Sequence, residues 1–72
     1  MSEVIKCGYT KGGFYAVFNH GNYSSLWVIE EQPENLKPET VERFAMEHED
    51  EGWSVAGSLE QVEAELVEVL EQ

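Results

Sequence analysis

Basic residues are scarce in this sequence. Only 4 Lys and Arg stand against 15 Asp and Glu, and the formal net charge at pH 7 is therefore −11. This balance argues against direct nucleic-acid binding, because a duplex would repel the chain at every phosphate. The same repulsion disfavours an anionic membrane surface as a partner. We therefore expect that this chain binds neither nucleic acids nor membranes directly.

Cysteine and long apolar segments are also scarce. The single cysteine, Cys7, cannot form an internal disulfide, which is typical of proteins in a reducing cytoplasm. Residues 12–29 carry no formal charge, but the polar residues within them, Asn19 to Asn22 among others, argue against a membrane span of about 20 apolar residues. No basic region followed by an apolar stretch indicates a signal peptide. The sequence predicts a cytoplasmic location.

The apolar content is nevertheless sufficient for a folded domain. Hydrophobic residues make up 42% of the chain, which is too much for an acidic disordered tail. Residues 1–72 are predicted to form a single compact domain, with a thin core because domains of this size bury only about 60% of their unfolded surface. The charge is unevenly distributed within it. Residues 1–29 carry a net charge of +1, whereas residues 30–72 contain 14 acidic residues and carry −12.

The first half of the chain predicts three strands, at Val4–Tyr9, Phe14–His20 and Ser25–Glu31. The turn Thr10–Gly13 is expected to use glycine because glycine tolerates positive φ. Gly21–Asn22 predicts the second turn.

The second half predicts two helices. Pro38 suits the first position of a helix that Gly52 is expected to end, and one face of this helix is apolar: Val41, Phe44, Ala45 and His48. Trp53–Ala56 is either a fourth strand or a packed connection. Ser58 with Gln61 forms a capping-box pattern before the last helix, whose apolar stripe comprises Leu59, Val62, Leu66, Val69 and Leu70.

Together these elements predict an α+β two-layer domain. A three- or four-stranded antiparallel sheet packs against two acidic amphipathic helices, in the order β-β-β-α-(β)-α. Both faces of this sheet are apolar, because strand residues alternate sides and few of them are polar. We expect one face to carry an aromatic partner- or dimer-binding surface consisting of Tyr15, Val17, Trp27 and Ile29. This face could be covered by helices on both sides of the sheet, by a second copy of the chain, or by a partner protein.

Motifs for chemistry are weak. Cys7 and His20 could face each other across adjacent strands, but no third orienting group accompanies them. The acidic run around His48 lacks the spacing of zinc and calcium motifs. The sequence therefore predicts no enzyme activity, no catalytic residue, no cofactor and no dedicated metal site.

The acidic helices are the strongest functional signal. Lysine is absent from the last helix, although a lysine four residues after a glutamate would stabilise it by a few tenths of a kcal/mol. Such a pattern can serve solvation alone, as in halophilic proteins. It can also form a surface that binds a basic partner. The predicted acidic partner-binding residues are Glu47, Glu49, Asp50, Glu51, Glu60, Glu63, Glu65 and Glu68.

The acidic surface leads to a hypothesis of nucleic-acid mimicry. Five glutamates on a helix of about 22 Å are spaced about 4–5 Å apart, and adding the neighbouring acidic helix brings the charge density near that of a duplex edge. In size and acidity the chain is similar in type to small phage-encoded anti-CRISPR and anti-restriction proteins, although no motif carries this similarity. That similarity implies an inhibitor in a host cytoplasm that occupies the basic surface of a nucleic-acid-binding protein. The alternative is a small cytoplasmic adaptor or regulator that uses the aromatic sheet face, either alone or as a homodimer.

Overall fold

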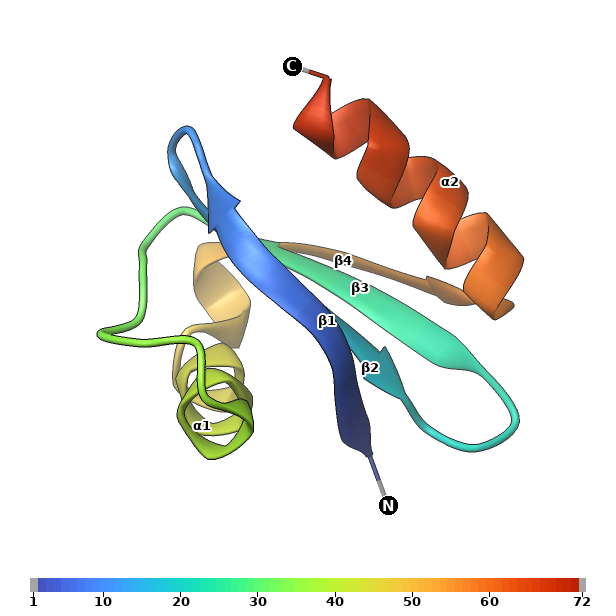
Figure 1. The fold of residues 1–72 in the computed structure, drawn as a ribbon, viewed down its shortest axis with the longest axis horizontal. Coiled ribbons are helices and arrows are strands. Elements are labelled where there is room, and N and C mark those ends of the chain that lie inside the picture. The colour runs from blue at the N-terminus through green and yellow to red at the C-terminus, as the bar shows by residue number, and fades with distance from the viewer. Residues whose placement is uncertain (1, 72) are drawn as a thin grey trace.

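A four-stranded antiparallel sheet forms the centre of the molecule (Figure 1). The computed structural model describes residues 2–71. The strands, β1 (Glu3–Thr10), β2 (Gly13–Asn19), β3 (Ser24–Ile29) and β4 (Gly52–Gly57), follow one another across the sheet in chain order. The helices are α1 (Pro38–Glu47) and α2 (Leu59–Leu70), with a short 3₁₀ helix, η1 (Glu49–Glu51), after α1. The predicted α+β fold and its element order are confirmed, and Trp53–Ala56 belongs to the fourth strand.

The two helices lie on opposite faces of the sheet, as the ribbon view shows (Figure 1). Val41 and Ala45 of α1 pack in one core cluster, whose sheet residues are Phe14, Ala16, Phe18 and Ile29. Val62 and Leu66 of α2 pack in a second cluster, whose sheet residues are Val17 and Leu26. The molecule therefore has three layers where the sequence predicted two, and the first of the three outcomes considered for the second sheet face holds.

The strand register corrects the predicted aromatic face. Phe14 pairs with Ile29 and Ala16 pairs with Trp27, whereas Tyr15 pairs with Val28. Directly paired residues point to the same side of a sheet, so Trp27 and Ile29 lie on the α1 face while Tyr15 and Val17 lie on the α2 face. The four residues do not form one surface. Val17 and Ile29 are also buried, with exposed fractions of 0% and 1%.

The β1–β2 turn depends on glycine for a different reason than expected. Among residues 2–71, Gly21 is the one residue with positive φ, at 100°, in the predicted second turn. Gly13 instead lies against the backbone of β3, where a Cβ atom would overlap the carbonyl oxygen of Ile29. Close approach of two strands, and not a left-handed conformation, requires glycine there.

Helix α1 starts where the sequence predicts and ends earlier. Pro38 is its first residue, but the helix ends at Glu47, where the backbone N–H of the next residue, His48, donates to the carbonyl oxygen of Phe44 at 3.0 Å. Gly52, the predicted end of the helix, is instead the first residue of β4. Here too glycine permits close packing, because a Cβ atom on Gly52 would overlap the carbonyl oxygen of Val28.

The start of α2 matches its prediction. The Ser58 hydroxyl accepts from the backbone N–H of Gln61, and the Gln61 side chain accepts from the backbone N–H of Ser58, which completes the capping box. The apolar stripe is only partly buried, because Leu59 and Leu70 are exposed. Within residues 2–71, neither helix is long and apolar enough to cross a membrane.

Candidate functional site: acidic surfaces and an apolar pocket

All 15 acidic side chains of the chain are exposed. Within residues 2–71, the ion pairs involve His48 alone, and no carboxylate lies within 4.0 Å of a lysine or arginine nitrogen. Internal ion pairs therefore neutralise almost none of the negative charge. These carboxylates remain free to attract an external cation.

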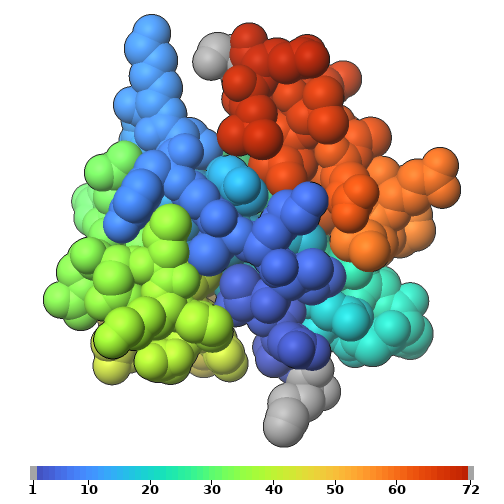
Figure 2. All heavy atoms as spheres, in the orientation of Figure 1, coloured from blue at the N-terminus to red at the C-terminus, as the bar shows by residue number. Residues whose placement is uncertain are grey.

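The eight predicted acidic residues fall on two separate surfaces, and Glu30, Glu31 and Glu42 join the first of them because they line the same hollows. The first, named here the α1–η1 acidic surface, consists of Glu30, Glu31, Glu42, Glu47, Glu49, Asp50 and Glu51. The second, named the α2 acidic surface, consists of Glu60, Glu63, Glu65 and Glu68. The sheet separates them, and in the space-filling view β1 lies at the surface between the two helical layers (Figure 2). The expectation that both helices add to one duplex-like edge is therefore wrong, because they pack on opposite faces.

The α1–η1 acidic surface is the larger of the two. Glu30, Glu31, Asp50 and Glu51 line one shallow hollow beside β4. Glu42 and Glu47 line another along α1, together with Arg43. The α1–η1 acidic surface contains seven acidic residues, against four in the α2 acidic surface. The chain segments that surround α1 therefore concentrate the charge on one side of the sheet.

His48 joins two acidic segments that are distant in sequence. Its Nδ1 lies 3.0 Å from the carbonyl oxygen of Phe44, and its ring stacks on the Phe44 ring at 3.9 Å. Its Nε2 then faces Glu31 Oε2 at 3.5 Å and Glu51 Oε2 at 3.9 Å. The ligand atoms of these three residues lie within 4.8 Å of one another, close enough to consider around one metal ion. The same geometry is an ion-pair cluster when the imidazole is protonated, and the expected absence of a metal site stays a prediction.

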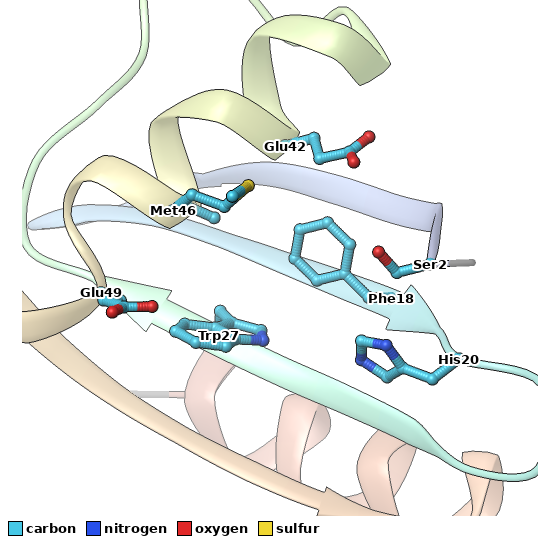
Figure 3. Close-up of a pocket in the computed structure, with 8 residues that line it drawn as sticks. Ser2, Phe18, His20, Trp27, Glu42, Met46 and Glu49 are labelled. Carbon is cyan, nitrogen blue, oxygen red and sulfur yellow. The ribbon is translucent and has the colours of Figure 1, made fainter.

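An apolar pocket lies between α1 and the sheet (Figure 3). Phe18 and Trp27 project from β2 and β3, and Met46 faces them from α1. Glu42 and Glu49 stand beside this apolar lining. The remaining lining residues are Ser2, His20 and Ala45.

Hydrogen bonds to one buried hydroxyl hold two of the pocket's rings. The indole N–H of Trp27 donates to Ser25 Oγ at 3.1 Å, and His20 Nε2 lies 2.7 Å from the same oxygen. His20 also stacks on Tyr23, with ring centroids 4.7 Å apart. These contacts restrict the ring orientations, so the pocket exists before any ligand binds.

Cys7 and His20 do not form a nucleophile pair. Cys7 pairs with Ala16, four residues along the strand direction from His20, which corresponds to about 13 Å. The thiol instead lies 3.7 Å from the carbonyl oxygen of Leu36. Burial raises the pKa of Cys7, so the thiol stays protonated at neutral pH. The arrangement lacks an activated nucleophile at this position.

Comparisons of the chain with protein-family models, curated proteins and solved structures find no match. A functional assignment must therefore come from the chain's own residues.

Sequence reasoning missed the pocket and one member of the His48 cluster. The pocket needs the pairing of β2 with β3 and the placement of α1, and neither is a local property of the sequence. Glu31 precedes His48 by 17 positions and belongs to a different segment. Periodicity did place His48 on the apolar side of α1, and that part of the signal was present in the sequence.

Proposed function

We propose that this chain is a non-enzymatic interaction protein that occupies the basic surface of a partner protein through the α1–η1 acidic surface. The observation that carries the proposal is the exposure of every carboxylate without a lysine or arginine counterpart among residues 2–71. Charges satisfied within the protein would offer little to a partner. Here the negative charge of the surface is not neutralised by the protein's own lysines and arginines, so it can attract a basic partner.

The expected partner is a nucleic-acid-binding protein. Proteins that hold phosphate backbones present clustered lysine and arginine side chains, and a dense carboxylate surface competes for those side chains. Complementary charge of this kind accelerates association and makes it sensitive to salt. The partner's own function would be blocked while the acidic protein is bound, which makes inhibition the proposed outcome.

The α1–η1 acidic surface is preferred over α2 for two reasons. It has more acidic residues, and two of its hollows, neither of them lined by a lysine or arginine among residues 2–71, give a basic partner side chain places to enter. On α2, the apolar side chain of Val67, which is 53% exposed, lies among the glutamates.

Capture and charge reversal test the proposal. The immobilised chain captures its partner from a cell lysate, elution along a salt gradient isolates it, and titration calorimetry then measures the affinity of the purified pair. Changing Glu47, Glu49, Asp50 and Glu51 together to Lys is expected to weaken binding at least about 100-fold and to reduce its salt dependence.

The matched control changes Glu60, Glu63, Glu65 and Glu68 together to Lys. This protein has the same net charge as the first variant, and it is expected to bind within about fivefold of the unmodified chain, because its substitutions lie on the other face of the sheet. Loss of binding in the α2 variant alone would move the interface to α2. Unchanged affinity and salt dependence in both variants would show that the acidic surfaces serve solvation only.

A further inference from the structure

The pocket between α1 and the sheet combines apolar walls with an acidic rim. Its volume is about 120 Å³, and Phe18, Trp27, Ala45 and Met46 supply the apolar contacts. This volume is less than the about 150 Å³ of an apolar cavity that accommodates benzene, so the pocket admits part of one side chain and is too small for a larger ligand. The occupant is therefore expected to be a slender group.

The charges around the pocket determine which side chain fits. Glu42 and Glu49 approach it from α1 and η1, and no lysine or arginine is among its lining residues. Trp27 contributes an indole whose ring face attracts cations. A neutral apolar side chain would pack against the apolar lining but would not pair with either carboxylate. An anionic side chain would be repelled by both carboxylates.

We propose that this pocket binds the side chain of an arginine from the protein partner. The methylene stem would contact Phe18 and Met46, while the guanidinium would stack on Trp27 and bind the Glu49 carboxylate beside it, with Glu42 adding attraction from the other side of the pocket. Arginine suits these walls better than lysine because its planar guanidinium stacks on aromatic rings and is less strongly hydrated. The identity of the occupant rests on the proposed function, since a basic partner surface is what supplies the arginine.

The pocket is held ready for such a ligand. The hydrogen bond from the Trp27 indole to Ser25 fixes the ring that would stack on the guanidinium. The 70% exposure of Met46 leaves its side chain free to adjust over an entering stem. Because the Trp27 ring is already held in place and Met46 can adjust to the ligand, less conformational entropy is lost when the ligand binds.

A short arginine peptide tests the pocket without the partner. N-acetyl-Gly-Arg-Gly-amide is titrated into the whole chain at millimolar concentrations and followed by NMR at the Trp27 indole and at the Met46 and Val67 methyl groups. The Trp27 and Met46 signals are expected to shift and saturate. The Val67 methyl groups are an internal reference, because Val67 is 53% exposed on α2, which packs on the other sheet face. Equal shifts at Met46 and Val67 would overturn the proposal.

Matched peptides separate charge from shape. Citrulline replaces the guanidinium by a neutral group of nearly the same shape, and its peptide is expected to bind about tenfold more weakly, because it loses the cation–π and carboxylate interactions. The lysine peptide is expected to bind about threefold more weakly than the arginine peptide. Equal binding of arginine and citrulline would contradict a cation site, and equal binding of arginine and lysine would overturn the assignment to arginine.

Three variants complete the test. Glu42→Gln and Glu49→Gln are each expected to weaken arginine binding about threefold, while Glu60→Gln, with the same change in net charge on the opposite face, leaves it unchanged. All three side chains are exposed, so the fold is expected to survive each substitution, which the NMR spectrum checks directly. Equal weakening in all three would indicate attraction by net charge alone and overturn the pocket.

The two proposals fail in distinguishable ways. If the peptide binds at Trp27 but charge reversal of the α1–η1 acidic surface leaves partner binding unchanged, the arginine site stands, while the proposed function and the partner as the source of the arginine are wrong. If charge reversal abolishes partner binding but the peptide causes no shift at Trp27, the function stands and the pocket proposal is wrong.

Discussion

At the scale of single residues, two adjacent glycines illustrate how backbone packing differs from backbone freedom. Gly12 has open space around its Cα, with no heavy atom within 4 Å of a built Cβ. Gly13 faces the end of β3, where the same atom would overlap the Ile29 carbonyl and lie 2.8 Å from the Glu30 Cα. The neighbouring strand therefore constrains only the second glycine.

Substituting these glycines separates the two effects. Gly13→Ala is expected to lower the free energy of unfolding by about 1–3 kcal/mol, because the backbone of β3 must move to admit the methyl group. Gly12→Ala is expected to be neutral or to stabilise by up to about 1 kcal/mol, because its φ is not positive and alanine restricts the unfolded chain. Urea unfolding of both variants measures the difference. Equal destabilisation would show that the turn itself, and not the close approach, requires glycine.

At the scale of secondary-structure elements, local chemistry in the sequence determines much of the fold. Pro38 marks the start of α1 and the Ser58–Gln61 pair marks the start of α2, both as predicted. Gly21 marks a turn through its positive φ. The end of α1 was misplaced because the short η1 segment intervenes before Gly52. Helix starts and turns that depend on neighbouring residues could thus be predicted from the sequence. The end of α1 could not, because it depends on the η1 and β4 segments that follow.

The capping box of α2 gives an element-scale prediction. Ser58→Ala removes the hydroxyl that accepts from the Gln61 N–H and is expected to cost about 1 kcal/mol of stability. Gln61→Ala removes the reciprocal bond, so the double variant is expected to lose less than the sum of the two single variants. Denaturant unfolding of the three proteins gives the coupling. Additive losses would contradict a reciprocal capping box.

The pairing of strands was the part of the fold that local signals could not supply. Alternation within a strand tells which residues share a side, but it does not tell which side of β2 matches which side of β3. The register joins Ala16 to Trp27 and Tyr15 to Val28, and it thereby divides the predicted aromatic surface between two faces. The same register places Trp27 beside Phe18 in the α1-side pocket. The pairing of β2 with β3 therefore rules out the predicted aromatic surface and forms part of the α1-side pocket.

At the scale of the whole molecule, the three-layer arrangement decides how the charge is presented. The sequence correctly indicated an acidic second half, and the structure places its two helices on opposite sides of a nearly neutral sheet. A flat basic surface can then contact one acidic layer directly, and not both. This geometry is the reason for assigning binding to the α1–η1 acidic surface alone.

If the α1–η1 acidic surface occupies the nucleic-acid-binding surface of a partner, the protein and a nucleic acid compete for that partner. A fluorescently labelled DNA or RNA duplex is bound to the purified partner, the acidic protein is added, and fluorescence anisotropy follows the duplex. We expect the unmodified chain to release the duplex stoichiometrically and the variant with Lys at positions 47, 49, 50 and 51 to release none. A stable complex containing partner, duplex and acidic protein together, with unchanged anisotropy of the duplex, would contradict it.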